Sequence, residues 1–323
     1  MKYTIHTDLA IEATALLNPE ESRDMNGIKT ENYKESYVSV TRVEILNAEG
    51  EKKIGKPIGN YVTLEVPKLR ENIINAFDSA KSVLTKELKD ILGLKKSDTV
   101  LVVGLGNRFV TPDALGPKVV DKLLVTRHLY GVLPDEITKD MNSLCAIAPG
   151  VLGITGIETG EIIKGICDKI KPNLIIAIDA LASRKTSRIS TTFQITDTGI
   201  VPGSGIGNKR KGLTKDTLGI PVVAIGVPTV IEAAAVASDA IELLIEAVKS
   251  HTQKDSPLFE AVSAFDNDNR YDLISEVLSP EAGDLIVTPK EVDSIIDEIS
   301  KIIAESINEA VNGRTSALLG EIL

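Results

Sequence analysis

The sequence is poor in the residues on which several classes of site depend. It has no tryptophan, and aromatic residues make up 3% of the 323 residues, so platforms for stacking bases or sugars are scarce. Three histidines, His6, His128 and His251, leave few positions for a histidine base or a histidine-rich metal site. Two cysteines, Cys145 and Cys167, form no disulfide framework and lack zinc-like spacing. Any catalytic chemistry therefore has to come from other residue types.

Basic residues are also fewer than acidic ones. The chain has 46 acidic and 36 basic side chains, a formal net charge of −10, which argues against a general nucleic-acid binder. No apolar run approaches the length of a membrane span, and the N-terminus lacks the long apolar core of a secretory signal. With 43% hydrophobic and 25% charged residues, the composition is that of an ordinary folded protein. We expect a soluble, cytoplasmic protein that binds neither nucleic acid directly nor a membrane.

Two patterns of hydrophobicity predict the architecture. Residues 36–45 and 60–66 alternate apolar and polar side chains, which predicts a small N-terminal antiparallel β element. Continuous apolar runs at 99–103 and 174–178, separated by helix-periodic stretches, predict parallel strands with helical crossovers. We therefore expect an α/β fold, a three-layer sandwich with a mainly parallel sheet. The other expected elements are strands at 143–148, 189–200 and 222–225, helices at 69–94, 112–124, 158–170, 230–249 and 292–311, and a turn at 48–51.

A glycine-rich turn follows the strand expected at 99–103. It reads Gly104-Leu105-Gly106-Asn107, but a dinucleotide fingerprint requires a third glycine where Phe109 stands. A tight turn whose backbone needs glycine is the favoured interpretation.

Two aspartates are the main candidates for chemistry. Thr111 and Pro112 can cap and start a helix, which places Asp113 in the first turn; the simplest role of its carboxylate there is to interact with the helix dipole. Asp179 directly follows the apolar run 174–178, so we expect it to end that strand at the carboxyl edge of the sheet, where ligands bind in open α/β folds. Asp113 follows the loop of another strand at the same edge, so the two acids can converge.

A close pair of carboxyl groups can hydrolyse an amide. Repulsion keeps one protonated while the ionised one activates water, and the protonated one polarises the scissile carbonyl and later protonates the leaving amine. Either acid can take either role. The competing use is a metal site of two acids and a histidine, as in a metal-dependent endopeptidase, but the expected turn 226–229 carries no histidine. A non-catalytic, oligomeric binder of acidic proteins is a third possibility.

Basic residues cluster in two stretches near this edge. A solvated surface is the simple interpretation, and a clamp for an acidic peptide is the functional one. The candidates are Arg184, Lys185 and Arg188, shortly after the second aspartate, and Lys209 and Arg210, in the glycine-rich stretch 203–212.

Five sequence blocks carry a resemblance to a known family. They are TDLAIE (7–12), VGLGNRFVTPDALGP (103–117), APGVLGITG (148–156), IIAIDALASR (175–184) and GSGIGNKR (203–210). In this order, and over nearly the whole chain, they resemble the germination protease family of spore-forming bacteria, atypical aspartic endopeptidases that degrade small acid-soluble spore proteins. That family is similar in architecture to the hydrogenase-maturation endopeptidases.

The resemblance implies specific roles. The two required aspartates of the family fall on Asp113 and Asp179, 66 positions apart. It further implies a homotetrameric, self-processing zymogen of the forespore and spore core, without a cofactor or bound metal. Family substrates follow the pattern Thr-Glu-apolar-Ala-x-Glu, which residues 7–12 resemble with Asp8 in place of the first Glu, so the maturing cut is expected between Asp8 and Leu9.

The same resemblance implies an organisation of the chain. Residues 1–8 form a propeptide, and residues 9–323 form a single α/β peptidase domain. Within it we expect an N-terminal β/α subregion at 30–95, a core at 96–250 and a C-terminal helical region at 251–323. An acid before the cut requires a cationic partner, and Arg184 is the first choice because it follows Asp179 by five residues.

Overall fold

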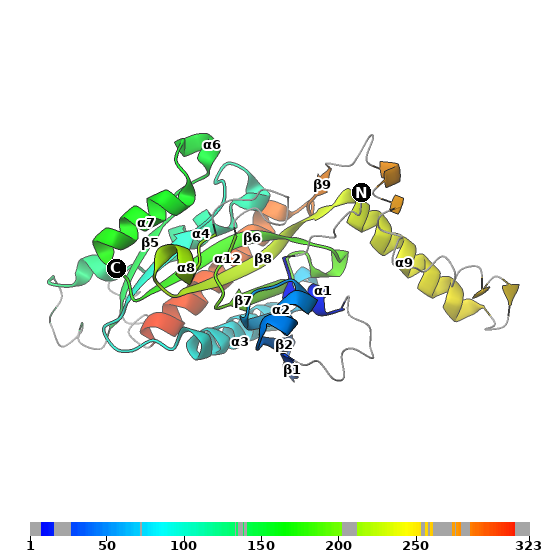
Figure 1. The fold of residues 1–323 in the computed structure, drawn as a ribbon, viewed down its shortest axis with the longest axis horizontal. Coiled ribbons are helices and arrows are strands. Elements are labelled where there is room, and N and C mark those ends of the chain that lie inside the picture. The colour runs from blue at the N-terminus through cyan, green and yellow to red at the C-terminus, as the bar shows by residue number, and fades with distance from the viewer. Residues whose placement is uncertain are drawn as a thin grey trace.

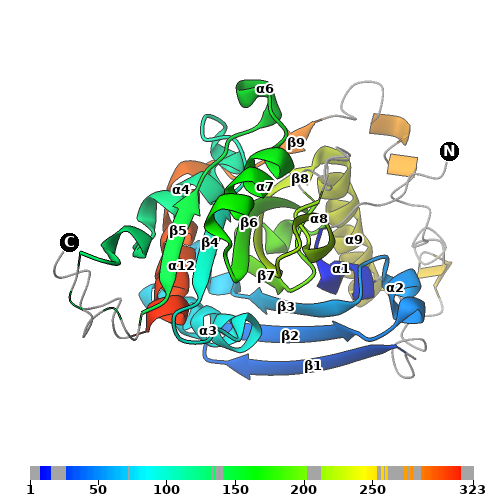
Figure 2. The ribbon, with the colours of Figure 1, turned by 60° about the vertical axis from the view of Figure 1, so that its left-hand side comes forward.

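A single β-sheet runs through the structure, a computed structural model (Figures 1 and 2). It describes residues 8–15, 27–71, 73–132, 134, 138, 141–201, 212–252, 256–257, 259–260, 273–274, 276–278 and 285–313. The strands lie in the order β1-β2-β3-β7-β8-β6-β4-β5, and β9 pairs with β8. Their bounds are β1 Ile28–Glu35, β2 Val38–Ile45, β3 Gly59–Glu65, β4 Thr99–Gly104, β5 Ser143–Ile147, β6 Leu174–Ser183, β7 Thr192–Thr196, β8 Val222–Glu232 and β9 Ile286–Val287.

The sheet is mixed, which corrects the expectation of a mainly parallel sheet with a separate antiparallel element. Strands β8, β6, β4 and β5 are parallel neighbours. Strands β1, β2, β3 and β7 are antiparallel neighbours, and β7 joins β8 in the antiparallel sense. The expected antiparallel element is therefore continuous with the parallel half, because β7 bridges β3 and β8.

Helices cover both faces of this sheet. On one face, α3 (Ile74–Leu92), α4 (Leu115–Lys122) and α12 (Val292–Asn312) pack on the larger apolar core. On the other face, α7 (Thr159–Ile170) and α8 (Lys215–Leu218) pack on a second core over the parallel half. The remaining helices are α1 (Ala10–Ala15) and α2 (Ala48–Ile54), which lie over the antiparallel half, α6 (Leu152–Thr155), and α9 (Ala233–His251), which projects from the body in Figure 1.

The central strand β6 shows why apolar runs predicted buried strands. Ile176 and Ile178 point into the larger core, whereas Ile175 and Ala177 point into the second one. Because successive side chains of a strand face opposite sides, a strand covered on both faces needs apolar residues at every position.

Several elements differ from the sequence-based expectation. β6 and β8 are longer than expected: Asp179 lies inside β6 rather than at its end, and 226–229 is strand rather than turn. Their mutual pairing continues to Ser183 and Ile231, so the backbone polar groups stay bonded. Residues 48–54 form α2 instead of a turn, since the Asn47 side chain accepts hydrogen bonds from the first amides of the helix.

The edge strand β1 was not expected either. Apart from Ile28 its residues are not buried, so it carries no apolar alternation that the sequence could reveal. Within the described part of the chain, no helix is both long and apolar enough to cross a membrane.

Candidate active site

The candidate site begins where β4 ends and β6 continues. The Leu105 amide donates to the carbonyl oxygen of Ile178 at 2.8 Å, which closes the pairing of the two strands. From Asp179 onward β6 runs on beside β8. The carboxyl edge of the parallel half is therefore stepped, and Asp179 lies at the step.

The loop after β4 carries Asp113 to this step. The Asn107 amide donates to Asp113 Oδ2 at 2.8 Å, and the short 3₁₀ turn Thr111–Asp113 lies in contact with β6 and β8. Gly106 has a φ of +108°, and a Cβ there would collide with the carbonyl oxygen of Asp113. Thr111 donates to Asp293 of α12 at 3.0 Å rather than capping the helix.

Asp179 projects from the face opposite the larger core. It is 6% exposed, and its Oδ1 accepts a hydrogen bond from the Ala180 amide at 2.9 Å. The side chains before and after it belong to or pack on the larger core, so Asp179 points the other way. In register beside it lie Gly226 of β8 and then Gln194 of β7.

Gly226 places no side chain between these two residues, which leaves room there for the side chain of Leu181. A Cβ at Gly226 would collide with the Leu181 side chain, which occupies this part of the sheet surface. Asp179 and Gln194 are thus separated by a strand position that has no side chain of its own. The structure brings the Asp113 turn against this same strand pair, and the catalytic roles of the two aspartates stay a prediction.

The N-terminal segment of the chain crosses this surface. Asp8 Oδ2 accepts a hydrogen bond from the Ala182 amide at 3.0 Å. The Asp8 carbonyl oxygen accepts from Lys56 Nζ at 3.1 Å and from Gln194 Nε2 at 3.0 Å. The Ala10 amide donates to Gln194 Oε1 at 2.5 Å. The segment around the bond between residues 8 and 9, where the cut is expected, is therefore bound over β6 and β7 by groups of the sheet and the α2–β3 loop.

Glu12 is bound a few residues further along. It is 3% exposed and accepts hydrogen bonds from Ser183 Oγ at 3.1 Å and from the amides of Arg184 and Lys185 at 3.0 and 3.3 Å. Arg188 Nη1 lies 3.2 Å from its Oε1. A buried carboxylate is stable only when it is paired and hydrogen-bonded, and this site meets both requirements.

The structure thus assigns the predicted basic residues to places that the sequence did not indicate. Arg184 and Lys185 donate their backbone amides to Glu12, and the Lys185 ammonium pairs with Asp239 and Glu242. The carboxylate before the expected cut, for which Arg184 was the first choice, accepts from a backbone amide of β6. The two other candidates, Lys209 and Arg210, lie outside the described residues.

Lys56 and Gln194 were missed by sequence reasoning. Lys56 follows a stretch that was expected to be a turn, and Gln194 is one polar position in the short strand TFQIT. Burial lowers the pKa of Lys56, and the carboxylates of Asp8 and Glu12 oppose that effect. Beside Asp8 a cavity of about 240 Å³ is lined by Lys56, Gln194, Leu181 and Gly226, among others.

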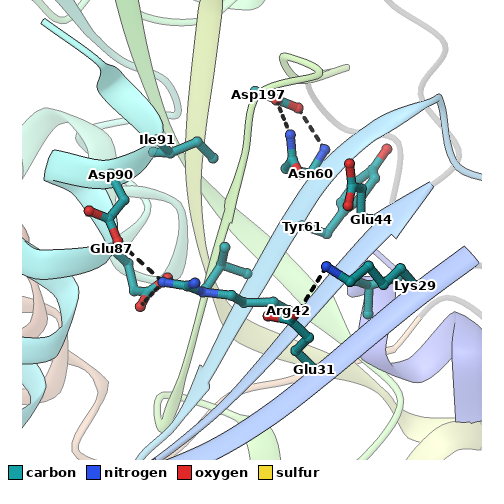
Figure 3. A pocket seen from close by; sticks show the side chains of 12 residues that line it. Lys29, Glu31, Arg42, Glu44, Asn60, Tyr61, Glu87, Asp90, Ile91 and Asp197 are labelled. Atoms are coloured by element: carbon teal, nitrogen blue, oxygen red, sulfur yellow. Dashed lines mark hydrogen bonds and ion pairs between the residues drawn. The ribbon is translucent and has the colours of Figure 1, made fainter. Parts of the chain in front are cut away.

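A second hollow, between the antiparallel strands and α3, is also rich in charge (Figure 3). It encloses about 360 Å³, and the buried Glu87 is among the residues that line it. Arg42 binds Glu87 through two nitrogens, at 2.9 and 2.8 Å, and also contacts Asp90 at 3.3 Å. Figure 3 shows Arg42 bonded to both Glu87 and Asp90, so the charged groups of this hollow attach α3 to the sheet.

Across the described residues, three or more histidine, cysteine, aspartate or glutamate side chains do not gather in a way that could hold a metal ion.

An α/β sheet whose edge brings two aspartate-bearing elements together, and which binds a peptide segment further along the same strand, is an arrangement that suits a peptide hydrolase. Comparison with known proteins gives the particular family. A model of the germination protease family matches residues 6–258 and 246–317. The germination protease of Clostridium acetobutylicum is 48% identical over 311 residues, 95% of each chain.

Two further germination proteases are also similar. That of Clostridium tetani is 46% identical over 308 residues, 95% of each chain. That of Bacillus cereus is 42% identical over 347 aligned positions, covering 96% of this chain and 94% of that protein. The chain belongs to the germination protease family, and it is therefore an endopeptidase.

Proposed function

We propose that the chain is an aspartic endopeptidase in which Asp113 and Asp179 form the catalytic pair. Its substrates are the small acid-soluble spore proteins, whose degradation it initiates during germination. One observation supports the proposal: the segment that contains the Asp8–Leu9 bond is bound on the extension of β6 that also carries Asp179, with the Asp8 carboxylate on the amide of Ala182, three residues further along the strand. The fold is related to the hydrogenase-maturation endopeptidases through its three layers.

The same observation supports a self-processing zymogen. Residues 1–8 are the propeptide and residues 9–323 the mature peptidase domain, because the segment around the expected cut already occupies the site. Spore-protein substrates would then bind in its place, and their last glutamate would occupy the site that now binds Glu12. The enzyme works as a homotetramer in the cytoplasm of the forespore and the spore core.

The direct test replaces each aspartate by the isosteric amide. Asp113→Asn and Asp179→Asn should each lower self-processing and cleavage of an added spore protein by roughly a hundred- to ten-thousand-fold, since an amide cannot exchange the proton. Asp297→Asn, which removes a carboxylate paired with Lys122 on the surface of α12, is the matched control and should leave both rates unchanged. Folding is checked by circular dichroism, and a variant with near-parental turnover removes that aspartate from the mechanism.

The alternatives separate in the same assay. A metal-dependent endopeptidase loses activity in a chelator and regains it with a divalent ion, whereas an aspartic one does neither. A non-catalytic binder captures spore proteins and never cleaves them. N-terminal sequencing of the processed chain locates the cut, and a start other than Leu9 counts against the proposed site.

A further inference from the structure

We infer that Lys56 and Gln194 are catalytic residues that bind the oxygen of the scissile carbonyl and stabilise the negative charge that develops on it. The inference rests on the proposed cut between Asp8 and Leu9. In the structure both side chains donate to the Asp8 carbonyl oxygen, at 3.1 and 3.0 Å. Two convergent donors on one carbonyl oxygen are the geometry of an oxyanion hole.

Gln194 has a second function at the same bond. Its Nε2 donates to the carbonyl of Asp8 while its Oε1 accepts from the amide of Ala10, so one side-chain amide bridges the backbone on both sides of Leu9. In a parallel β-sheet, one residue likewise bonds the carbonyl before and the amide after the residue opposite it. The Gln194 side chain therefore binds the segment as a neighbouring strand would. Backbone carbonyl and amide groups occur in nearly every residue. Gln194 therefore positions the backbone of the bound segment and does not select its side chains.

Both residues are held in place by the fold. Gln194 is 7% exposed in β7, paired with Thr63 on one side and Gly226 on the other. Lys56 belongs to the loop between α2 and β3, which is fixed by a 2.8 Å hydrogen bond from the Tyr61 hydroxyl to the Pro57 carbonyl. Because the donors are preorganised and largely withdrawn from water, little reorganisation is needed as charge develops.

The chemical step balances without any further reactant. Water adds to the carbonyl carbon of residue 8, and the carbonyl electron pair moves to the oxygen that Lys56 and Gln194 bind. The bond between that carbon and the Leu9 nitrogen then breaks, and the nitrogen takes up the proton that the water gave to the aspartate pair. The products are a carboxylic acid on residue 8 and an amine on Leu9, and transfer of the acid's proton to the amine gives the carboxylate and the ammonium group. Because Lys56 and Gln194 polarise the carbonyl, the protonated aspartate is needed only to protonate the leaving amine.

The first experiment compares variants of the full chain. Lys56→Met should slow self-processing roughly a hundred- to a thousand-fold, the loss found when one oxyanion donor is removed, and Lys56→Arg should restore part of the rate. Gln194→Glu keeps the acceptor for the Ala10 amide but loses the donor to the Asp8 carbonyl. Self-processing should therefore also be slower in this variant. Thermal unfolding checks that each variant is folded.

The second experiment uses processed enzyme and a peptide containing Thr-Asp-Leu-Ala-Ile-Glu. In Lys56→Met, kcat should fall with little change in KM, and the pH profile should keep its shape because the aspartates are untouched. The same loss should occur with a peptide that has Asn in place of the acid before the cut. If the loss disappears with the Asn peptide, Lys56 only pairs with the substrate carboxylate and the inference is wrong.

The third experiment isolates the second function of Gln194. N-methylation of the alanine two residues after the cut removes its amide hydrogen, and for the parent enzyme this should raise KM at least about ten-fold. For Gln194→Leu the methylated and unmethylated peptides should behave alike. Equal losses in both enzymes would overturn the assigned contact.

These outcomes separate the inference from the proposed function. If Asp179→Asn stays active or the cut lies elsewhere, the proposed function fails. If Asp179→Asn is inactive while Lys56→Met and Gln194→Glu cleave at the parental rate, the aspartate pair stands and the oxyanion site is refuted.

Discussion

At the residue scale, the surroundings of Glu12 support the proposal that a substrate glutamate is bound at this site. Four groups of the 183–188 stretch bind this one buried carboxylate, three of them as hydrogen-bond donors from Ser183, Arg184 and Lys185 and one as the Arg188 guanidinium. Glu12 is the fourth residue after the expected cut. A site that binds this glutamate therefore fixes its spacing from the scissile bond.

This leads to a prediction for Arg188. Arg188→Met should raise KM at least about ten-fold for a peptide with Glu four residues after the cut, because loss of one partner leaves a carboxylate buried without its counter-charge. The loss should be several-fold smaller for the peptide with Gln there. Glu65→Gln, which removes the other partner of Arg188, is the control and should not change this preference. Equal losses for both peptides would make Arg188 a structural residue.

Gly106 gives a second prediction at this scale. Gly106→Ala should destabilise the fold by about 1–3 kcal/mol and lower activity strongly, since the added Cβ has to displace the backbone of Asp113. Gly93→Ala is the matched control: Gly93 also has a positive φ, of 53°, but nothing lies near its missing Cβ. Gly93→Ala should therefore lower stability without lowering activity. Unfolding in urea and peptide turnover measure the two effects, and parental turnover in Gly106→Ala would contradict this account of the loop.

Residue patterns pointed to both aspartates as candidates but not to their surroundings, and Asp179 lies inside β6 and not at its end as expected. Asp113 and Asp179 stand in recognisable sequence blocks after apolar runs, so a candidate pair could be named. Lys56 and Gln194 lie 138 positions apart in the chain. They meet only because β7 inserts between β3 and β8, and such long-range pairing leaves no mark in local composition.

At the element scale, periodicity identified strands and helices well and strand length poorly. The apolar run of β6 stops at Ile178, yet the strand continues to Ser183 because β8 pairs with it throughout. Pairing supplies the stability that side-chain pattern does not show. The site lies in this extension of β6, which explains why Asp179 was expected at the end of a strand.

Tyr61 of β3, whose hydroxyl donates to the loop between α2 and β3, gives a pH-dependent prediction. Burial raises the pKa of Tyr61 to about 12, above its ordinary value near 10. The folded state therefore holds this proton more tightly, so the stabilisation is complete below pH 10 and is lost as the pH rises to 12. Over that range the free energy of unfolding should fall by about 2–3 kcal/mol more in the parent than in Tyr61→Phe.

Urea unfolding at several pH values measures this difference. Tyr37→Phe, at an exposed tyrosine, is the control and should follow the parent. Parallel curves for the parent and Tyr61→Phe would show that the Tyr61 hydroxyl titrates alike in the folded and unfolded states.

At the scale of the whole molecule, α9 is the element least explained by the fold of one chain. Its buried residues are few, and it projects from the body in Figure 1. Leu243 and Leu244 are 61% and 63% exposed, two large apolar side chains together on a protruding helix. Exposed apolar groups of this kind often mark interfaces between chains, and the proposed homotetramer requires such an interface.

We expect the double substitution Leu243→Asp with Leu244→Asp to reduce the assembly from tetramer to smaller species, because two carboxylates cannot be buried in an apolar contact without partners. Leu46→Asp, an equally drastic change at an exposed leucine next to β2, should leave the mass unchanged. Light scattering coupled to size-exclusion chromatography measures both. If the parent chain is itself a monomer at micromolar concentration, the homotetramer is wrong; if the double variant stays tetrameric, the subunits meet through a surface other than α9.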